Sequence, residues 1–485
     1  MANPRDPAPG DPSTRALMLL WGAGLAAVVL LIYRKVNSTP EYGLVFNDML
    51  ARLLQGRFDL DPSVIGTEAF VHGGRAYAYF GVFCALLRLP LWLTGQMGVD
   101  MTKASMIGAA GLSLAARLGA MRRALTHTDL PRELRLILMG AVAFGGESLQ
   151  YLRPGLFQEV SAWGAALAAV FVWLAVTRIF GAGRRTGALY AGMAVLAGLA
   201  LICRVSFGLG LYAALGLMLA VEAWRARGRL PVLRTLAPAV LVLALFLGAA
   251  GAVNAARWGD PSSFVPLRYQ VYQRQRDPDR VWRLDHYGAA NLQRAPFALQ
   301  YYFAPVWEFQ DRQGLLLFQK TQLDLFDSVE LPPSSLLLSD PAICLLAGLG
   351  VWALLRRPGL ISDRPTAGAA LAGLLLAPAV MLTAISLAFR YRMDFYPSLD
   401  FAACLGAASL GAWARARLFL YLALGGALAA FAGLMLYDYS PYGPALDLDL
   451  RGGWTTPILQ TAQGRDPYIG HLLPDGRRLA APNGR

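Results

Sequence analysis

Repeated apolar runs of about 17 to 22 residues constrain the fold of this chain more than any other sequence feature, because each can cross a hydrocarbon layer of about 30 Å as a helix. The chain has 485 residues, of which 56% are hydrophobic and only 15% charged. This composition excludes an ordinary soluble globular protein. The sequence therefore predicts an all-α polytopic membrane protein.

Eleven stretches are predicted to span the membrane. The first is preceded by a short Pro-rich segment, residues 1–15, which we expect to be disordered and cytoplasmic. No small-residue cleavage site follows the first stretch, so we interpret it as an uncleaved anchor. The predicted spans are residues 17–33, 102–121, 134–149, 160–178, 187–203, 206–224, 232–253, 336–355, 367–388, 395–413 and 416–436.

Arginine-rich loops between alternate pairs of spans predict the topology. The positive-inside rule places them in the cytoplasm, with an inside N-terminus and an outside C-terminus. This count requires residues 80–95 to be an interfacial or re-entrant helix on the outer face, with Arg88 snorkelling to water. The outer side then receives loops 34–101 and 254–334 and a periplasmic tail, 437–485. The arginines are Arg122, Arg123, Arg132, Arg135, Arg178, Arg184, Arg185, Arg225, Arg227, Arg229, Arg234, Arg356, Arg357, Arg364, Arg415 and Arg417.

Composition also excludes several classes of function. The net charge of +13 is explained by these loops, so nucleic acid is not an expected partner, whereas membrane lipids are. The four cysteines and four histidines lack zinc or haem spacing, and neither a P-loop nor a nucleotide-binding Gly-rich turn is present. No cofactor is predicted with certainty. A divalent cation remains open, held by outer-face acids: Glu41, Asp48, Glu147, Glu159 and Asp394.

The first outer loop carries two candidate catalytic carboxylates, Glu41 and Asp48. Apolar residues recur at helical spacing from residue 44 and the pattern ends at Gly56, which predicts an amphipathic helix on the membrane surface. A carboxylate at that depth suits a general base. The alternative interpretation is structural: Glu41 caps the helix and Asp48 pairs with Arg52 four residues on.

Basic residues next to aromatic or acidic ones are candidates for binding a substrate. Arg75 alternates with tyrosines after a Gly-Gly turn, a pattern that fits phosphate or sugar as well as an interfacial tyrosine belt. Arg153 and Glu159 lie in a short outer turn, although Glu159 also suits a helix N-terminus. Arg204 lies at the outer end of a span with no acid nearby in sequence, and we expect it to need an anion.

The strongest of these groups is the segment FRYRMDFYP. It places Arg390, Arg392, Asp394 and Tyr396 at the outer mouth between the ninth and tenth spans. Guanidinium forks match phosphate oxygens, whereas interfacial snorkelling accounts for a single arginine more easily than for two beside an aspartate.

Five segments of the sequence, in the order in which they occur along the chain, resemble the GT-C class of membrane glycosyltransferases. The similar segments are DMLARLLQG, YAYFGVFCALLRLPL, RPGLFQE, NAARWGDPSSF and RYRMDFYP, and the likeness covers residues 16–436. The resemblance implies a transmembrane domain with juxtamembrane helices in its first outer loop. It also implies a polyprenyl-phosphate-linked sugar as donor, and a glycan, lipid or protein acceptor on the periplasmic face of a bacterial inner membrane.

The resemblance further implies roles for single residues. Glu41 best matches the carboxylate that deprotonates the acceptor, with Asp48 in reserve, and Arg153, Arg204, Arg390 and Arg392 match the basic groups that stabilise the departing phosphate. The alternative function is a transporter or flippase for a lipid-linked or anionic solute. Span centres that look free of charge, and the lack of a convincing internal repeat, count against transport.

Overall fold

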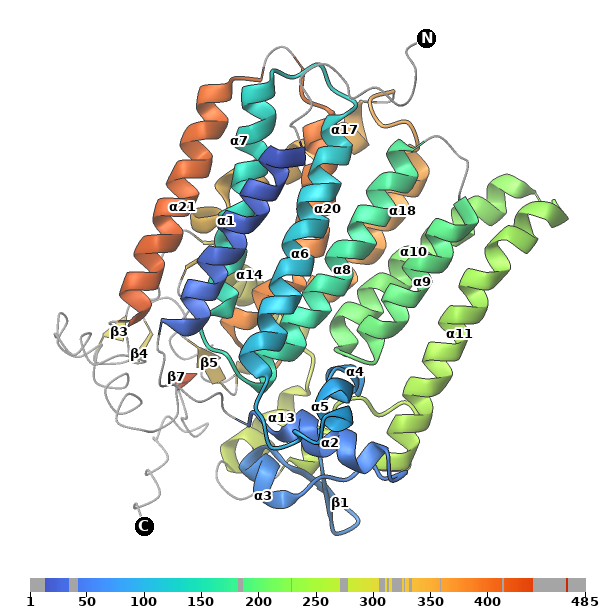
Figure 1. Ribbon diagram of the computed structural model, residues 1–485, viewed down its shortest axis with the longest axis vertical. Coiled ribbons are helices and arrows are strands. Elements are labelled where there is room, and N and C mark those ends of the chain that lie inside the picture. Colours follow the sequence, from blue (N-terminus) through green and yellow to red (C-terminus); the bar gives the residue numbers. More distant parts are fainter. Residues whose placement is uncertain are drawn as a thin grey trace.

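The computed structural model describes residues 14–34, 42–181, 186–227, 229–270, 278–304, 310–311, 314–315, 325–326, 328–330, 334–357, 359–411, 414–438 and 468–469. Within them the chain forms a bundle of long helices, with short helices and small hairpins gathered at one end (Figure 1). The predicted all-α polytopic architecture is confirmed. Nearly all of residues 1–15 and of the tail 437–485 lie outside the described residues, so the predictions for those segments stay predictions.

Seven described helical segments are long and apolar enough to cross a membrane. Four shorter helices, α7 (Arg132–Ala143), α9 (Thr186–Leu201), α17 (Pro341–Arg356) and α20 (Tyr396–Ala408), run alongside them in the bundle (Figure 1). Crossing by these four, and hence the count of eleven spans, stays a prediction. The seven are α1 (Thr14–Tyr33), α6 (Thr102–Leu125), α8 (Leu156–Phe180), α10 (Val205–Ala226), α11 (Leu230–Trp258), α18 with α19 (Arg364–Leu374 and Leu376–Leu382) and α21 (Ala416–Asp438).

The two ends of the bundle differ in chemistry. Helices α6, α10 and α17 each carry arginine in their last turn. These turns lie at the end where α1 begins (Figure 1), which we call the arginine-rich end. The opposite end holds the segments 42–101 and 259–304, and we call it the polar-loop end. This distribution agrees with the predicted alternation of the loops.

Close helix packing depends on glycine at the contact of α17 with α20. A Cβ added to Gly350 would lie 1.9 Å from the carbonyl oxygen of Ala402, and one added to Gly406 would lie 1.9 Å from that of Leu346. The two backbones therefore touch directly, as small residues permit in membrane bundles. Helix α6 packs similarly along α8, α10 along α18, and α9 along α11.

The first loop of the polar-loop end is compact. Its amphipathic helix is present as α2 (Val45–Leu53), and Gly56, at φ 73°, follows it as predicted. Gly73 and Gly74, both at positive φ, make the hairpin turn between β1 (Phe70–His72) and β2 (Arg75–Tyr77). The other elements of this loop are α3 (Pro62–Ile65), η1 (Gly66–Glu68), α4 (Phe83–Leu86) and α5 (Leu89–Leu93).

Residues 80–95, expected to form an interfacial or re-entrant helix on the outer face, form the two short helices α4 and α5 at the polar-loop end. The expectation that Arg88 snorkels to water is wrong, because this residue is 0% exposed and pairs with Glu159 on α8. The buried carboxylate of Glu159, and not water, therefore compensates the charge of Arg88.

Short elements complete the polar-loop end. Strand β5 (Ser328–Glu330) runs parallel to β6 (Ser386–Leu387) and antiparallel to β7 (Tyr468–Ile469), so the chain near its C-terminus returns to this end. The others are η2 (Gly146–Tyr151), η3 (Leu267–Tyr269), α13 (Pro278–Tyr287), η4 (Leu292–Arg294), α14 (Ala295–Phe303), β3 (Gln310–Asp311), β4 (Gly314–Leu315), α16 (Leu336–Ser339) and η5 (Phe389–Asp394).

Candidate functional site

Two of the predicted arginines meet at the polar-loop end. Arg204 is the N-cap of α10 and Arg390 lies in η5. Their guanidinium carbons lie 5.2 and 5.1 Å from the centroid of the Tyr391 ring, and that of Arg390 lies 4.8 Å from the ring of Phe157 at the start of α8. Cations over aromatic faces are held in place without losing their charge. We call Arg204, Arg390, Tyr391 and Phe157 the arginine cluster.

A carboxylate positions one of these arginines. Arg204 Nη2 donates to Asp394 Oδ2 at 2.8 Å, and Ser206 donates to the other oxygen of the same carboxylate. The chain itself therefore supplies an anion for Arg204, from a residue 190 positions away in the sequence. The side chain of Asp394 is fully buried, whereas that of Arg204 is 14% exposed. Asp394 thus fixes the position of Arg204, and Ser161 accepts a further hydrogen bond from Nη1 of the same guanidinium.

Aromatic rings from the first loop join the arginine cluster. The Tyr79 ring lies 4.1 Å from that of Phe80, which contacts Phe157 at 5.5 Å. Burial raises the pKa of Tyr79, and Tyr391 acts in the same direction, while Arg390 and Arg204 oppose the shift. The phenol therefore stays neutral and keeps a hydroxyl that can donate a hydrogen bond.

Glu68 is a carboxylate near this site that the sequence reasoning missed. It lies in η1, accepts a hydrogen bond from Gln270 Nε2 at 3.0 Å, and interacts electrostatically with Tyr79. In the sequence it stands in GTEAF without a charged neighbour, so no pattern marks it. The hairpin that follows it carries Tyr79 to the arginine cluster, and this places Glu68 within reach of the site.

Of the two candidate bases, only Asp48 can be placed; Glu41 lies outside the described residues. Both oxygens of Asp48 accept from Arg52 Nε at 3.1 Å, and one also accepts from the backbone N–H of Asp61 at 2.7 Å. The predicted pairing with Arg52 is confirmed, and its side chain is 20% exposed. Beside this pair, the hydrogen bond from Arg57 lowers the pKa of Asp59.

Glu159 is held in a fully buried ion pair. Arg88 donates from Nη1 to Glu159 Oε1 at 2.6 Å and from Nη2 to Oε2 at 2.7 Å, and both side chains are 0% exposed. The Nε of Arg88 reaches Asn47 Oδ1 at 3.2 Å. Arg88 is the N-cap of α5, so this network ties α2 and the start of α5 to α8. A role for Glu159 in binding substrate stays a prediction, and its observed contacts are structural.

Arg392 and Tyr396 belong to a second buried network. Arg392 donates to the Ser334 carbonyl at 2.9 Å and to Ser339 Oγ at 2.7 Å, and Tyr396 donates to Asp340 Oδ2 at 2.9 Å. The side chains of Arg392 and Asp340 are both 0% exposed. Asp340 was also missed by the sequence reasoning. Arg392 thus has a different environment from Arg390, although only one residue separates them.

Charged residues also lie within the helices of the bundle. Arg117 of α6 donates from Nε to Asp400 Oδ2 of α20 at 2.7 Å and forms an ion pair with Glu147 of η2. The expectation of span centres free of charge is therefore wrong. Burial of the Arg117 charge is compensated because its Nε and Nη2 donate to Asp400 and its Nη1 donates to Glu147.

The remaining predicted site residues lie in more peripheral places. Arg75 is exposed at the tip of the β1–β2 hairpin, where its backbone pairs with His72. Arg153 is half-buried in the bend between η2 and α8. The roles of both residues in binding substrate stay predictions.

Arg257 is a buried cation that the sequence reasoning passed over within NAARWG. It lies in the last turn of α11, is 2% exposed, and donates from Nη1 to the Phe80 carbonyl at 2.7 Å. Its Nε has no hydrogen-bond partner within the described part of the chain. Arg257 therefore supports the segment that carries Tyr79, and its Nη2 also lies 3.8 Å from Met49 Sδ of α2.

Four of the five acids that we expected to share a cation lie among the described residues, and these four do not form one cluster. Asp48, Glu147, Glu159 and Asp394 each pair with a different arginine. Among the described residues, no group of three or more His, Cys, Asp or Glu side chains is arranged to hold a metal ion. The position of the fifth acid, Glu41, lies outside those residues.

Comparison with known proteins gives a structural likeness only. No protein-family model matches the chain, and a comparison with curated proteins finds no match either. Among solved structures, ArnT from Cupriavidus metallidurans, bound to undecaprenyl phosphate, has a TM-score of 0.51 at 13% identity, covering 93% of this chain and 70% of that one. An oligosaccharyltransferase from Archaeoglobus fulgidus follows, with a TM-score of 0.49 at 12% identity, covering 91% of this chain and 59% of that one.

The likeness to ArnT confirms the GT-C-type fold that the sequence resemblance implied. At this level of identity it establishes the arrangement of the helices and nothing of the chemistry. This chain is thus a multi-pass membrane protein of that fold. What it does must be argued from its own residues.

Proposed function

We propose that this protein is a membrane glycosyltransferase that moves a sugar from a polyprenyl-phosphate donor to a glycan, lipid or protein acceptor. The observation that carries the proposal is the arginine cluster: two guanidinium groups, one of them paired with Asp394, lie over one tyrosine ring at the polar-loop end. Guanidinium groups held in this way suit an anionic leaving group. The undecaprenyl phosphate bound to ArnT, which shares the fold, supports this choice of carrier.

The chemistry divides between the two sides of this site. When an acceptor hydroxyl attacks the anomeric carbon, the bond from that carbon to the carrier phosphate breaks, and the phosphate leaves with an additional negative charge. Arg204 and Arg390 stabilise that charge. A carboxylate of the first loop takes the hydroxyl proton, with Glu41 as leading candidate and Asp48 as reserve. A single displacement of this kind transfers a hexosyl or pentosyl unit with inversion.

The positive-inside rule supports a location for this reaction. The arginine-rich end faces the cytoplasm under that rule, so the polar-loop end faces the opposite side. In a bacterium, the proposed site is the periplasmic face of the inner membrane. The donor sugar and the acceptor follow from the experiment below.

Binding of undecaprenyl phosphate to the purified protein tests the role of the cluster. We expect Arg390→Gln to weaken binding by about 10- to 150-fold, since a hydrogen bond to a charged group contributes about 1.5–3 kcal/mol. Arg268→Gln is the matched control, because Arg268 also lies over a tyrosine ring, at 4.9 Å, in another loop of the same end. Equal binding by the two variants would contradict the proposal.

The glycan and glycolipid profile of a deletion strain tests the activity itself. Complementation with the wild type is expected to restore a missing sugar, whereas Glu41→Gln combined with Asp48→Asn is expected to fail. Restoration by this double variant would remove both carboxylates as candidate bases while leaving the binding assay unaffected.

One observation favours the alternative of a transporter or flippase. The ion pair of Arg117 with Asp400 lies inside the bundle, and charged residues within membrane helices often mark a transport pathway. Reconstitution of the protein with a fluorescent polyprenyl-phosphate lipid separates the two functions. Movement of the lipid between leaflets without any transfer of sugar would favour the flippase.

A further inference from the structure

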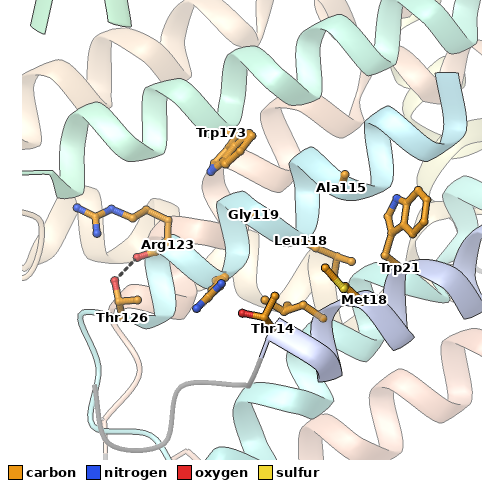
Figure 2. Close-up of a pocket in the computed structure, with 11 residues that line it drawn as sticks. Thr14, Met18, Trp21, Ala115, Leu118, Gly119, Arg123, Thr126 and Trp173 are labelled. Carbon is orange, nitrogen blue, oxygen red and sulfur yellow. Dashed lines mark hydrogen bonds between the residues drawn. The ribbon is translucent and has the colours of Figure 1, made fainter. Parts of the chain in front are cut away.

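A groove at the arginine-rich end, far from the proposed catalytic site, has no assigned role. It is a cavity of about 470 Å³ lined by residues of α1, α6 and α8. Figure 2 shows α6 as its floor, with Trp21 and Met18 of α1 on one side and Trp173 of α8 on the other. Met18, Trp21 and Trp173 are exposed, so the groove opens on the outer surface of the bundle, where acyl chains surround a membrane protein.

The walls of the groove are fixed in position. Trp21 Nε1 donates to the Gly111 carbonyl of α6 at 2.8 Å, which holds the indole across that helix. On the other side, a Cβ added to Gly119 would lie 2.9 Å from the Trp173 ring, so Gly119 is what allows this indole to lie against α6. The groove is therefore a built feature and not a gap between mobile side chains.

The charged residues that line the groove are all positive and lie at one end of it. Its lining contains Arg122 and Arg123 in the last turn of α6 and no acidic residue. Arg123 Nη2 donates to the Phe180 carbonyl at 2.7 Å, and Arg123 Nε is buried without a hydrogen-bond partner in the described part of the chain. Two cations therefore lie at one end of a groove whose other lining residues are mostly apolar.

We propose that this groove binds one anionic phospholipid of the leaflet at the arginine-rich end. The headgroup phosphate lies against Arg122 and Arg123, at the level where α1 begins and α6 ends. One acyl chain lies along Leu118 and Ala115 between the two indoles. Phosphate on arginine with aromatic side chains at the interface is the arrangement that charge and depth both favour. The lipid fills the space that α1 leaves beside α8.

Quenching of tryptophan fluorescence by brominated lipids in nanodiscs tests this proposal. Brominated phosphatidylglycerol is the probe and brominated phosphatidylcholine the neutral reference. We expect Trp173 emission, taken as the difference between wild type and Trp173→Phe, to be quenched preferentially by phosphatidylglycerol. Loss of two arginines is expected to weaken this preference by about 30-fold, since each contributes about 1 kcal/mol near an anionic surface.

Two pairs of variants separate the groove from general surface charge. Arg122→Gln with Arg123→Gln removes the charges, and Arg356→Gln with Arg357→Gln is its control, because those two arginines are exposed at the same end. Ala115→Trp fills the groove and keeps both cations. Ala115 is exposed on α6, so the larger side chain does not enter the core.

The control for filling is Leu112→Trp, an exposed position of the same helix that does not line the groove. The proposal requires that the groove variants lose the preference for phosphatidylglycerol and that both controls keep it. Equal quenching by the two lipids in the wild type, or an unchanged preference in Ala115→Trp, would overturn it. Equal quenching by the two lipids would instead favour a helix of a partner protein as the occupant of the groove.

Discussion

Removing one partner of the Arg88–Glu159 pair tests how the polar-loop end is held to the bundle. Glu159→Gln leaves the guanidinium of Arg88, which is 0% exposed, without a counter-charge, while glutamine keeps nearly the same side-chain shape as glutamate. Two charge-assisted hydrogen bonds, at 2.6 and 2.7 Å, are lost or weakened. Breaking a buried ion pair in this way costs about 3–5 kcal/mol, and we expect the free energy of unfolding to fall by that amount.

Titration of the purified protein with a denaturing detergent, followed by tryptophan fluorescence, measures that free energy. Asp61→Asn is the matched control, because Asp61 is 46% exposed, lies 3.6 Å from Arg52, and caps α3 in a way that asparagine can reproduce. An exposed pair of this kind contributes about 0–1 kcal/mol. The double variant Arg88→Met with Glu159→Leu removes both charges and should be more stable than Glu159→Gln alone.

The reasoning is refuted if Glu159→Gln folds and loses less than about 1 kcal/mol, a cost typical of a solvated pair. It is also refuted if the double variant is no more stable than the single one. In that case the packing volume of these side chains, and not their charge, would link the start of α5 to α8.

Three further predictions follow from other parts of the molecule. Gly350→Ala should destabilise the protein by about 1–3 kcal/mol through overpacking against α20, whereas Gly348→Ala, with open space at its Cβ, should be neutral or slightly stabilising by the same unfolding assay. The hydrogen bond from Arg57 lowers the pKa of Asp59 in the folded protein, so this carboxylate contributes stability above its unfolded pKa of about 3.9, and the contribution is lost as pH falls further. Asp59→Asn should therefore flatten that part of the pH profile of the unfolding midpoint. An unchanged profile would exclude a contribution from the Arg57–Asp59 pair. In intact spheroplasts, an impermeant maleimide should label Arg75→Cys and spare Arg356→Cys; the reverse result would invert the topology.

The main architecture could be predicted because it depends on local properties of the sequence. The length of an apolar run sets whether a helix can span, and the spacing of apolar residues around Asp48 identified the surface helix. The same local logic found the pairing of Asp48 with Arg52, four residues along one helix.

The pairing of the buried charges could not be predicted, because it depends on which helices pack together. Arg88 meets Glu159 across 71 residues, and Arg204 meets Asp394 across 190. In both cases the two residues had been noticed separately, and an arginine was assigned to water or to a ligand anion when its partner was a distant carboxylate. Glu68 and Asp340 were overlooked for the same reason, since their importance comes from neighbours that the fold supplies.

The long separation within the Arg117 network has a consequence for how the chain is made. Asp400 is translated 283 residues after Arg117, which at about 5–20 residues per second is a delay of roughly 15–60 s. During that time α6 carries a cation with no partner on α20. Glu147 is translated only 30 residues after Arg117 and bonds to the same guanidinium. Glu147 is thus the first of the two carboxylates that can pair with Arg117 while the helices are inserted into the membrane. Asp400 joins the network later.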